Sequence, residues 1–278
     1  ETRAAGPVLA YIKEQIASEL ALQPRVQLIA REKVEQSLRD ARISYQGNKR
    51  PDQPEILADL VDAGGILVGT YWEQSDLLEF NLQIIERNSA ATLAATTMRI
   101  PKALLPAGMQ YLPANYAAFA QANQLGNVKA PKDDLQVEVW VDRGDGAIYH
   151  AGEKVTIFVR ATQDCYLYLL YHDAGGNDVL IFPNARQANN AILGGVIYQI
   201  PDARDSFDFT VQKPFGSELL KAVVAKEPLP DLAGEMMENG LKLLKGSYQN
   251  HLTRLRGLGL KPRLQGYAED SCVVTAVE

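Results

Sequence analysis

The sequence has few residues of the types that build metal sites and nucleophilic active sites. Its 278 residues include only two cysteines and three histidines. Neither cysteine has a Cys or His neighbour at the spacing of a zinc or redox motif. No two histidines are spaced to present ligands on one face of a helix. The sequence therefore predicts no metal ligands, no cofactor and no catalytic residue, so we expect a protein that is not an enzyme.

The chain also lacks an excess of basic residues and any long apolar run. It has 28 Lys and Arg against 34 Asp and Glu, a net charge of -6, whereas nucleic-acid binding requires a basic face. No stretch is long and apolar enough to cross a bilayer. Because the sequence begins at Glu1 rather than at Met, we expect a targeting segment to precede it, and a lipid anchor there would be the one route to a membrane.

What remains is the composition of a folded globular protein, with 46% hydrophobic and 22% charged residues. Residues 1–107 are predicted to form an α+β domain with helices packed on one sheet. Helical spacing of apolar residues indicates helices at 8–20, 31–41 and 51–62, around a short strand at 26–30. Period-two alternation then indicates three successive strands at 66–72, 77–87 and 92–100.

Residues 108–133 are predicted to be a linker with an Ala-rich helix at 114–122, and residues 134–278 an antiparallel β-sandwich. Val137, Val139 and Val141 alternate with polar or amphipathic residues, which is typical of a strand with one wet face. After residue 228, the apolar residues Met236, Met237, Leu241 and Leu244 indicate an added helix. The predicted fold class is therefore α+β throughout.

The segment 165–184 is predicted to be a β-hairpin in the core of the sandwich. Its turn at 173–178 has three oxygen-bearing side chains of the kind that calcium prefers, but it lacks EF-hand spacing, and its Gly and Asn residues suit a tight turn. His172 stands next to Asp173 and could act as an oriented general base, but no nucleophile motif accompanies the pair. We interpret both features as parts of the hairpin.

The two cysteines leave two alternatives open. Cys165 lies on the predicted core strand and Cys272 on the predicted last strand. If these strands are neighbours, a disulfide would close a long loop and contribute about 3–5 kcal/mol. Alternatively, both thiols are buried and pack as small hydrophobic side chains. A disulfide would agree with an extracytoplasmic location.

Two groups of residues are candidates for an interaction surface. Tyr166 and Tyr168 share one face of a predicted strand, where they suit protein binding if exposed, or where a packed layer such as the predicted helix after residue 228 covers them. The second group is a basic cluster near the C-terminus, which either meets an anionic partner or forms a solvated face. It consists of Arg254, Arg256, Lys261 and Arg263.

A series of short motifs runs through the first domain. It passes from a strand-to-helix segment at 28–34, through a polar segment ending at Gly47, to the strand at 63–71 and the strand end at 99–101. In this order the series resembles the FlgO-like and CsgG-like family of bacterial envelope proteins over roughly residues 5–105. The family's Gly-Ala-Asp before the 63–71 strand is present only in part. The resemblance implies association with envelope assemblies and no catalysis.

The second domain has five landmarks in order between residues 135 and 228. They are Tyr149-His150-Ala151-Gly152-Glu153, the strand 165–170, Ile181-Phe182-Pro183-Asn184, Ile200-Pro201 and Pro214-Phe215-Gly216-Ser217-Glu218. This region resembles the bacterial domain of unknown function 4384, an accessory module of surface and signalling proteins. The resemblance implies no reaction.

Together these features predict a non-enzymatic accessory protein of the bacterial cell envelope, periplasmic or associated with the outer membrane. We expect it to bind another envelope protein during assembly or stabilisation of a surface machine, with edge strands as docking sites. The alternative is a ligand-sensing module that binds a glycan or peptide between its domains. A third hypothesis, a hydrolase with a dispersed active site, has no motif in its favour.

Overall fold

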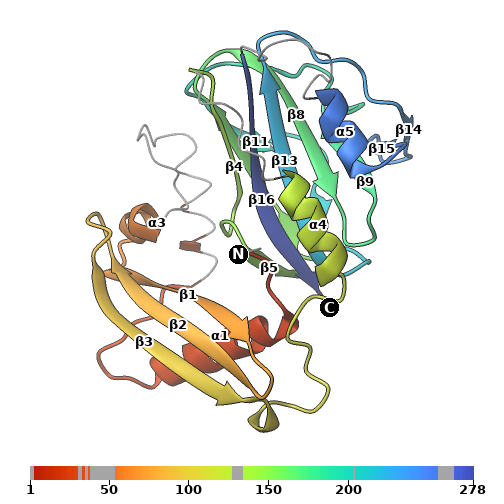
Figure 1. Ribbon diagram of the computed structural model, residues 1–278. Coiled ribbons are helices and arrows are strands. Elements are labelled where there is room, and N and C mark those ends of the chain that lie inside the picture. The colour runs from red at the N-terminus through yellow and green to blue at the C-terminus, as the bar shows by residue number, and fades with distance from the viewer. Residues whose placement is uncertain are drawn as a thin grey trace. The chain divides into compact units, whose positions relative to one another are not determined.

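The computed structural model of the chain has a mixed α+β fold (Figure 1). It describes residues 3–30, 33–34, 37, 54–126, 134–202, 204–255 and 266–278. The chain divides into two compact units. The smaller unit consists of residues 6–112 with residues 142–144, and the larger unit of residues 1–5, 113–141 and 145–278.

The smaller unit contains a three-stranded antiparallel sheet in the order β1-β2-β3. Its elements are α1 (Pro7–Ala21), α3 (Pro54–Leu60), β1 (Gly65–Glu73), β2 (Leu77–Glu86), β3 (Thr92–Pro101) and the short 3-10 helix η1 (Lys102–Leu104). The three predicted strands are confirmed, and so are the helices predicted at 8–20 and within 51–62. The strands share one buried layer, in which Leu78 and Phe80 of β2 pack with Tyr71 of β1 and Met98 of β3.

Helix α1 packs on this sheet through the apolar residues that its spacing places on one face. Val8 and Ile12 are buried in one cluster with Leu78 of β2. The chain enters α1 through Gly6, where a Cβ would lie only 2.1 Å from the carbonyl oxygen of Tyr111. Only glycine permits this close approach of two backbone segments.

The strand predicted at residues 26–30 is wrong. These residues belong to no helix or strand, and Val26 and Leu28 are 40% and 45% exposed. Among the described residues no strand pairs with them, and an apolar run without a partner cannot form a stable strand. Most of the helix predicted at 31–41 lies outside the described residues.

The larger unit is built on three sheets. The main one has eight strands, in the order β14-β15-β9-β8-β13-β16-β5 with β10 also paired to β8, and the others have the orders β11-β7-β4 and β12-β6. The strands are β4 (Val137–Val141), β5 (Ala147–His150), β6 (Lys154–Val155), β7 (Ile157–Ala161), β8 (Cys165–His172), β9 (Asp178–Phe182), β10 (Ala191–Ile192), β11 (Ile197–Ile200), β12 (Phe209–Thr210), β13 (Gly216–Ala225), β14 (Gly234–Met236), β15 (Lys242–Leu244) and β16 (Tyr267–Val277). The helices are α4 (Tyr116–Gly126) and α5 (Tyr248–Leu255).

The eight-stranded sheet is covered on both faces. On β8, Leu167 and Leu169 point into a core shared with β4 and β7 of the second sheet. On the other face α4 and α5 lie over the sheet (Figure 1), with Phe119 and Leu252 buried against Leu219 of β13. Helix α4 confirms the Ala-rich helix predicted within residues 108–133. Cover on both faces explains why every residue of β13 is buried, including the polar side chains of Ser217, Glu218 and Lys221.

Two predictions for this unit are wrong. The sheet is not purely antiparallel, because β5 pairs parallel to β16, with Val274 opposite Ala147. The helix predicted around Met236 and Met237 is instead the hairpin β14–β15. Its turn runs from Met237 to Gly240, whose amide donates to the Met237 carbonyl at 2.9 Å and whose φ is +86°. A glycine in this left-handed position after a tight turn is a hairpin signal that outweighs the helical spacing.

No helix in the part of the chain that the structure describes has the length and hydrophobicity needed to cross a membrane.

Candidate functional site

Two histidines meet one carboxylate beneath helix α5. The Nδ1 atom of His172 lies 2.7 Å from Oδ1 of Asp178, and the Nε2 atom of His251 lies 3.4 Å from Oδ2 of the same residue. The His172 ring also contacts the ring of Tyr248, with centroids 5.0 Å apart. Asp178 is opposite His172 in the β8–β9 register, so the hairpin itself brings the pair together.

The burial of this cluster indicates a structural role. The side chains of Asp178 and His251 are each 3% exposed and that of His172 is 12% exposed. A substrate therefore cannot reach the carboxylate, and the cluster instead ties α5 to strands β8 and β9. The neighbour pair His172 and Asp173 considered as a general base is not formed, because Asp173 points into the turn.

The 173–178 turn is held by one carboxylate. Oδ1 of Asp173 accepts hydrogen bonds from the amides of Gly175 and Asn177, at 2.9 and 2.8 Å, and Oδ2 accepts one from the Asn177 side chain. Gly176 takes a φ of +85°. These bonds are those of a capped tight turn, which is the interpretation the sequence favoured over calcium binding. Within the described ranges no group of three or more His, Cys, Asp and Glu residues could hold a metal ion.

Glu218 is a buried acid of β13. It is 4% exposed, and it accepts a hydrogen bond from the hydroxyl of Tyr171. Burial raises the pKa of Glu218 from 4.5 to about 7, although the Tyr171 hydroxyl and the Ala174 amide both favour its ionised form. Burial and the nearby Glu218 carboxylate raise the pKa of Tyr171 well above 10. The pair is enclosed in the protein, so it influences stability rather than chemistry on a substrate.

Cys165 and Cys272 are both buried, and no disulfide joins them in this fold. Cys272 is opposite Leu220, and Leu220 is opposite Tyr171. Tyr171 lies six residues along β8 from Cys165, so the two cysteines are separated by about 20 Å along the strand direction. A disulfide needs Cα atoms within about 7 Å of each other. In this fold the two cysteines are therefore packed thiols rather than a disulfide, and both lie in the main hydrophobic core.

The candidate interaction residues have different positions. Tyr168 is only 9% exposed, and its hydroxyl accepts a hydrogen bond from the amide of Leu229 at 2.9 Å. Tyr166 is half-buried against the same cluster. A packed layer thus covers both tyrosines, but it is formed by the chain around Leu229 and Leu232 rather than by a helix. Arg254 lies in α5, its side chain outside the description, and Arg256, Lys261 and Arg263 lie outside the described residues.

The best-placed exposed apolar residues of the larger unit lie on the connection from β10 to β11. This segment, 192–197, passes from the eight-stranded sheet to the three-stranded sheet. The first and last residues of the segment, Ile192 and Ile197, are buried, whereas Leu193 is 59% and Val196 is 43% exposed. We call Leu193 to Val196 the apolar tip. The sequence signal is the Gly-Gly pair within Ile-Leu-Gly-Gly-Val-Ile, which marks a turn inside an apolar run.

The apolar tip is rigidly held. The amide of Leu193 donates to the hydroxyl of Tyr198 at 2.9 Å, and that of Gly194 donates to the Asp164 carboxylate at 2.8 Å. The amide of Gly195 donates to the Ala161 carbonyl at 2.8 Å. Three consecutive amides are therefore engaged, so the two exposed apolar side chains have a fixed backbone position.

The close packing of Gly194 gives a first prediction. A Cβ at this position would lie 2.5 Å from the Cα of Gln163, so Gly194→Ala is expected to lower the free energy of unfolding by about 1–3 kcal/mol. Urea unfolding measures the change. Gly195→Asn is the control, since Gly195 has open space around it and a φ of +77° that Asn tolerates. Equal stability of Gly194→Ala and wild type would show that the tip is not held against Gln163.

Residues 148–228 match the family model described as Domain of unknown function (DUF4384). This confirms the resemblance stated for the second domain, over the segment from β5 to just past β13. No curated protein matches the chain, and no solved structure does. Nothing in these comparisons supports the FlgO-like and CsgG-like resemblance of residues 5–105, which stays a prediction.

The structure shows what two of the landmark motifs within the matched segment do. Oε2 of Glu153 accepts a hydrogen bond from the amide of His150 at 2.7 Å, and Gly152 between them has a φ of +82°. These residues form the turn that ends β5. Asn184 is 8% exposed, and its side-chain oxygen accepts bonds from the amides of Arg186 and Gln187, both at 2.9 Å. Both landmarks thus stabilise turns, and the apolar tip lies within the same matched segment.

Proposed function

We propose that this protein is a non-enzymatic accessory protein of the bacterial cell envelope, and that the apolar tip is where it binds another envelope protein. The observation that carries the proposal is the rigid backbone beneath two exposed apolar side chains. Binding normally costs conformational entropy when a loop is ordered. A tip already held by three hydrogen bonds avoids most of that cost, and apolar anchors that fill a pocket dominate many interfaces.

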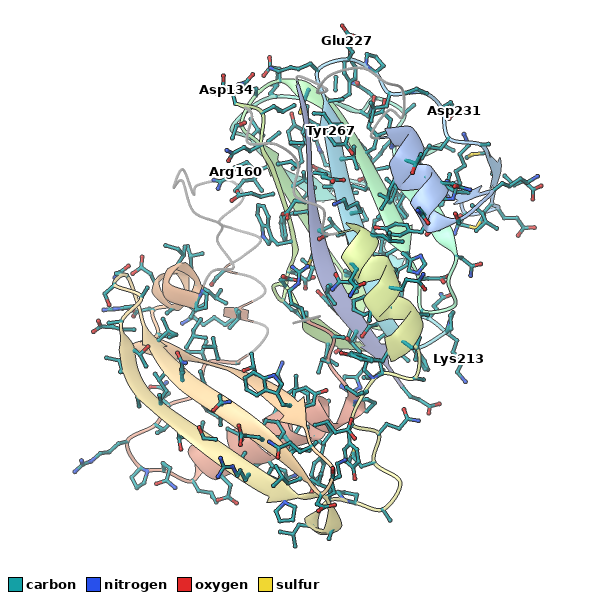
Figure 2. The ribbon with its side chains drawn as sticks, viewed as in Figure 1. Asp134, Arg160, Lys213, Glu227, Asp231 and Tyr267 are labelled. Carbon is teal, nitrogen blue, oxygen red and sulfur yellow. The ribbon has the colours of Figure 1, made fainter. Side chains whose placement is uncertain are left out.

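The charges around the tip favour a protein pocket with a basic rim over a lipid surface. The amide of Gly194 donates a hydrogen bond to the Asp164 carboxylate. Next to the tip, the hydroxyl of Thr162 donates one to the backbone carbonyl of Asp134. Figure 2 shows Asp134 and Glu227 at the same end of the larger unit. Anionic side chains are repelled by the negative surface of a bacterial membrane. Two cations only partly offset them: Lys226, which is bonded to Gln163, and Arg160, which lies opposite Ile197 but is itself paired with Glu138 at 2.7 Å.

Site-specific photocrosslinking in cells tests this proposal. A photoreactive residue at position 193 is expected to give one dominant crosslinked partner, because this side chain would lie in the partner's binding pocket. The same residue at Met236, which is 56% exposed on β14, is the matched control and should not give that partner. Identical crosslinks from both positions, or none from position 193, would refute the assignment of the tip.

The tip substitution Leu193→Asp with Val196→Asp gives a second prediction. We expect loss of partner binding, because a charged side chain cannot enter an apolar pocket without a large desolvation cost. The free energy of unfolding should change by no more than about 0.5 kcal/mol, since both side chains are exposed. Pull-down of the identified partner measures the first effect and urea unfolding the second. A large loss of stability would mean that these residues are structural.

The envelope location is tested separately by fractionating cells that produce the chain with its natural upstream sequence. Recovery in the periplasmic or outer-membrane fraction supports the proposal, and recovery in the cytosol contradicts it. The two buried thiols do not by themselves favour an oxidising compartment. The alternative of a glycan or peptide sensor stays a prediction, and a ligand-dependent rise in melting temperature would favour it.

A further inference from the structure

The smaller unit has two outer strands, and one of them, β3, has an exposed edge that is open to pairing. β3 pairs with β2 on one side, and among the described residues no strand pairs with its other side. Residues 92–97 are all exposed, and Leu93 is 56% exposed. In Figure 1 β3 forms the outer border of its sheet. A free edge of this kind presents a row of backbone donors and acceptors to another chain.

β3 is neither short nor capped, unlike two strand edges of the larger unit. No charged residue occurs from Thr92 to Met98, and the register with β2 has one β-bulge, at Leu93, and is regular from Ala94 to Pro101. In the larger unit, by contrast, the amide of Val139 on β4 is occupied by the Asp270 carboxylate at 2.9 Å, and the outermost strand β14 has only three residues. Short or capped edges prevent unwanted pairing.

We propose that β3 pairs antiparallel with β3 of a second copy of this chain, so that the two sheets form one continuous six-stranded sheet. A second copy brings the same open edge, so a single two-fold contact satisfies both edges at once and closes the assembly. In an antiparallel pair related by a two-fold axis, opposite residues point to the same face.

The side chains of β3 are self-complementary in a register centred on Thr96. Thr96 is then opposite Thr96 of the second copy, and Ala95 is opposite Thr97. Cross-strand threonine pairs are favourable. The one charged residue, Arg99, lies at the end of the contact, near the bulged Leu93 of the second copy, and is already paired with Glu79 on its own sheet at 2.7 Å. No like charges therefore face each other across the contact, and small side chains allow the strands to approach.

Sedimentation equilibrium of the purified full chain tests this inference. The expected species at micromolar concentrations has twice the chain mass of 30.6 kDa. Thr96→Lys and Thr96→Glu should each be monomeric, because like charges then face each other, and mixing the two variants should restore a dimer. Thr70→Lys, on the exposed part of the other outer strand β1, is the matched control and should remain dimeric.

Several results would overturn the inference. The wild-type chain could be monomeric throughout, or Thr70→Lys could dissociate the dimer while Thr96→Lys does not, which would place the contact on β1. A mixture of Thr96→Lys and Thr96→Glu that stays monomeric would exclude the register. Circular dichroism checks that each variant is folded. A dimer that forms again when the two Thr96 variants are mixed would show independently that both are folded. The outcome is separate from partner binding by the apolar tip, which lies on the other unit.

Discussion

Replacement of Lys221 by methionine is expected to lower the free energy of unfolding of the larger unit by about 3–5 kcal/mol, the usual effect of removing one partner from a buried ion pair. Lys221 is in the middle of β13, and its Nζ atom lies 3.2 Å from Oε2 of Glu269 on β16. Both side chains are 2% exposed. The variant leaves the Glu269 carboxylate buried without this cation.

Lys221 has a second role that adds to the expected loss. Its ammonium group also donates a hydrogen bond to the carbonyl oxygen of Gly126, the last residue of α4. A cation at the C-terminal end of a helix is stabilised by the helix dipole and satisfies a carbonyl that the helix leaves open. The same side chain therefore holds α4 against the sheet.

A double substitution separates the ion pair from simple packing. Lys221→Met with Glu269→Gln removes the uncompensated charge, so we expect it to recover at least half of the stability lost by Lys221→Met alone. Urea unfolding followed by the fluorescence of Trp140 measures both variants, because Trp140 is buried in β4 of this unit. Trp72→Phe removes the other tryptophan of the chain and its signal. Additive losses in the double variant would show that the two residues are not coupled.

Replacement of Glu218 by glutamine is expected to stabilise the protein at neutral and alkaline pH. Because the pKa of Glu218 is raised by burial to about 7, the folded protein holds this proton where the unfolded chain has lost it. The stability that protonated Glu218 contributes to the folded state is fully present below pH 4.5 and is lost as the pH rises through 7. The difference between 4.5 and about 7 corresponds to about 3 kcal/mol.

The expected result is therefore a difference in pH dependence. Near pH 4 the free energy of unfolding of Glu218→Gln should equal that of wild type, and at pH 8 it should be about 2–3 kcal/mol higher. The variant should therefore show little of the fall in stability that wild type undergoes between these pH values. Glutamine still offers an oxygen to the Tyr171 hydroxyl, so the hydrogen bond is kept. Glu227→Gln, at an exposed position, is the control and should leave the pH profile unchanged. A variant with the same profile as wild type would mean that Glu218 is not the residue that titrates.

The local patterns of the sequence were sufficient for many of the elements. Period-two alternation located β1, β2 and β3, and the turn chemistry of Asp173, Gly176 and Asn177 was interpreted correctly. Such features depend on residues a few positions apart, so the sequence contains all the information needed. The hairpin at Met236 was missed because the helical spacing of Met237, Leu241 and Leu244 was weighted above the Asn239-Gly240 pair that lies between them.

The candidate surfaces could not be predicted in the same way. Tyr168 is covered by a segment about sixty residues further along the chain, and Leu193 is exposed only because its loop crosses between two sheets. His172 meets Asp178 through the hairpin register and His251 through the placement of α5. Exposure and contact at these positions are properties of the packed layers, and a strand pattern alone does not say what lies above it.

From its sequence alone, this protein is an acidic α+β chain without metal-binding or nucleophilic motifs, whose second half has the landmarks of a domain of unknown function. Those conclusions follow from composition and from short-range periodicity. Only the tertiary structure decided that β5 joins the sheet in parallel, that Lys221 and Glu269 form a buried pair, that the cysteines lie far apart, and that the apolar tip is exposed. Each of these depends on strand register and layer packing between distant segments, which are determined by the burial of the whole core.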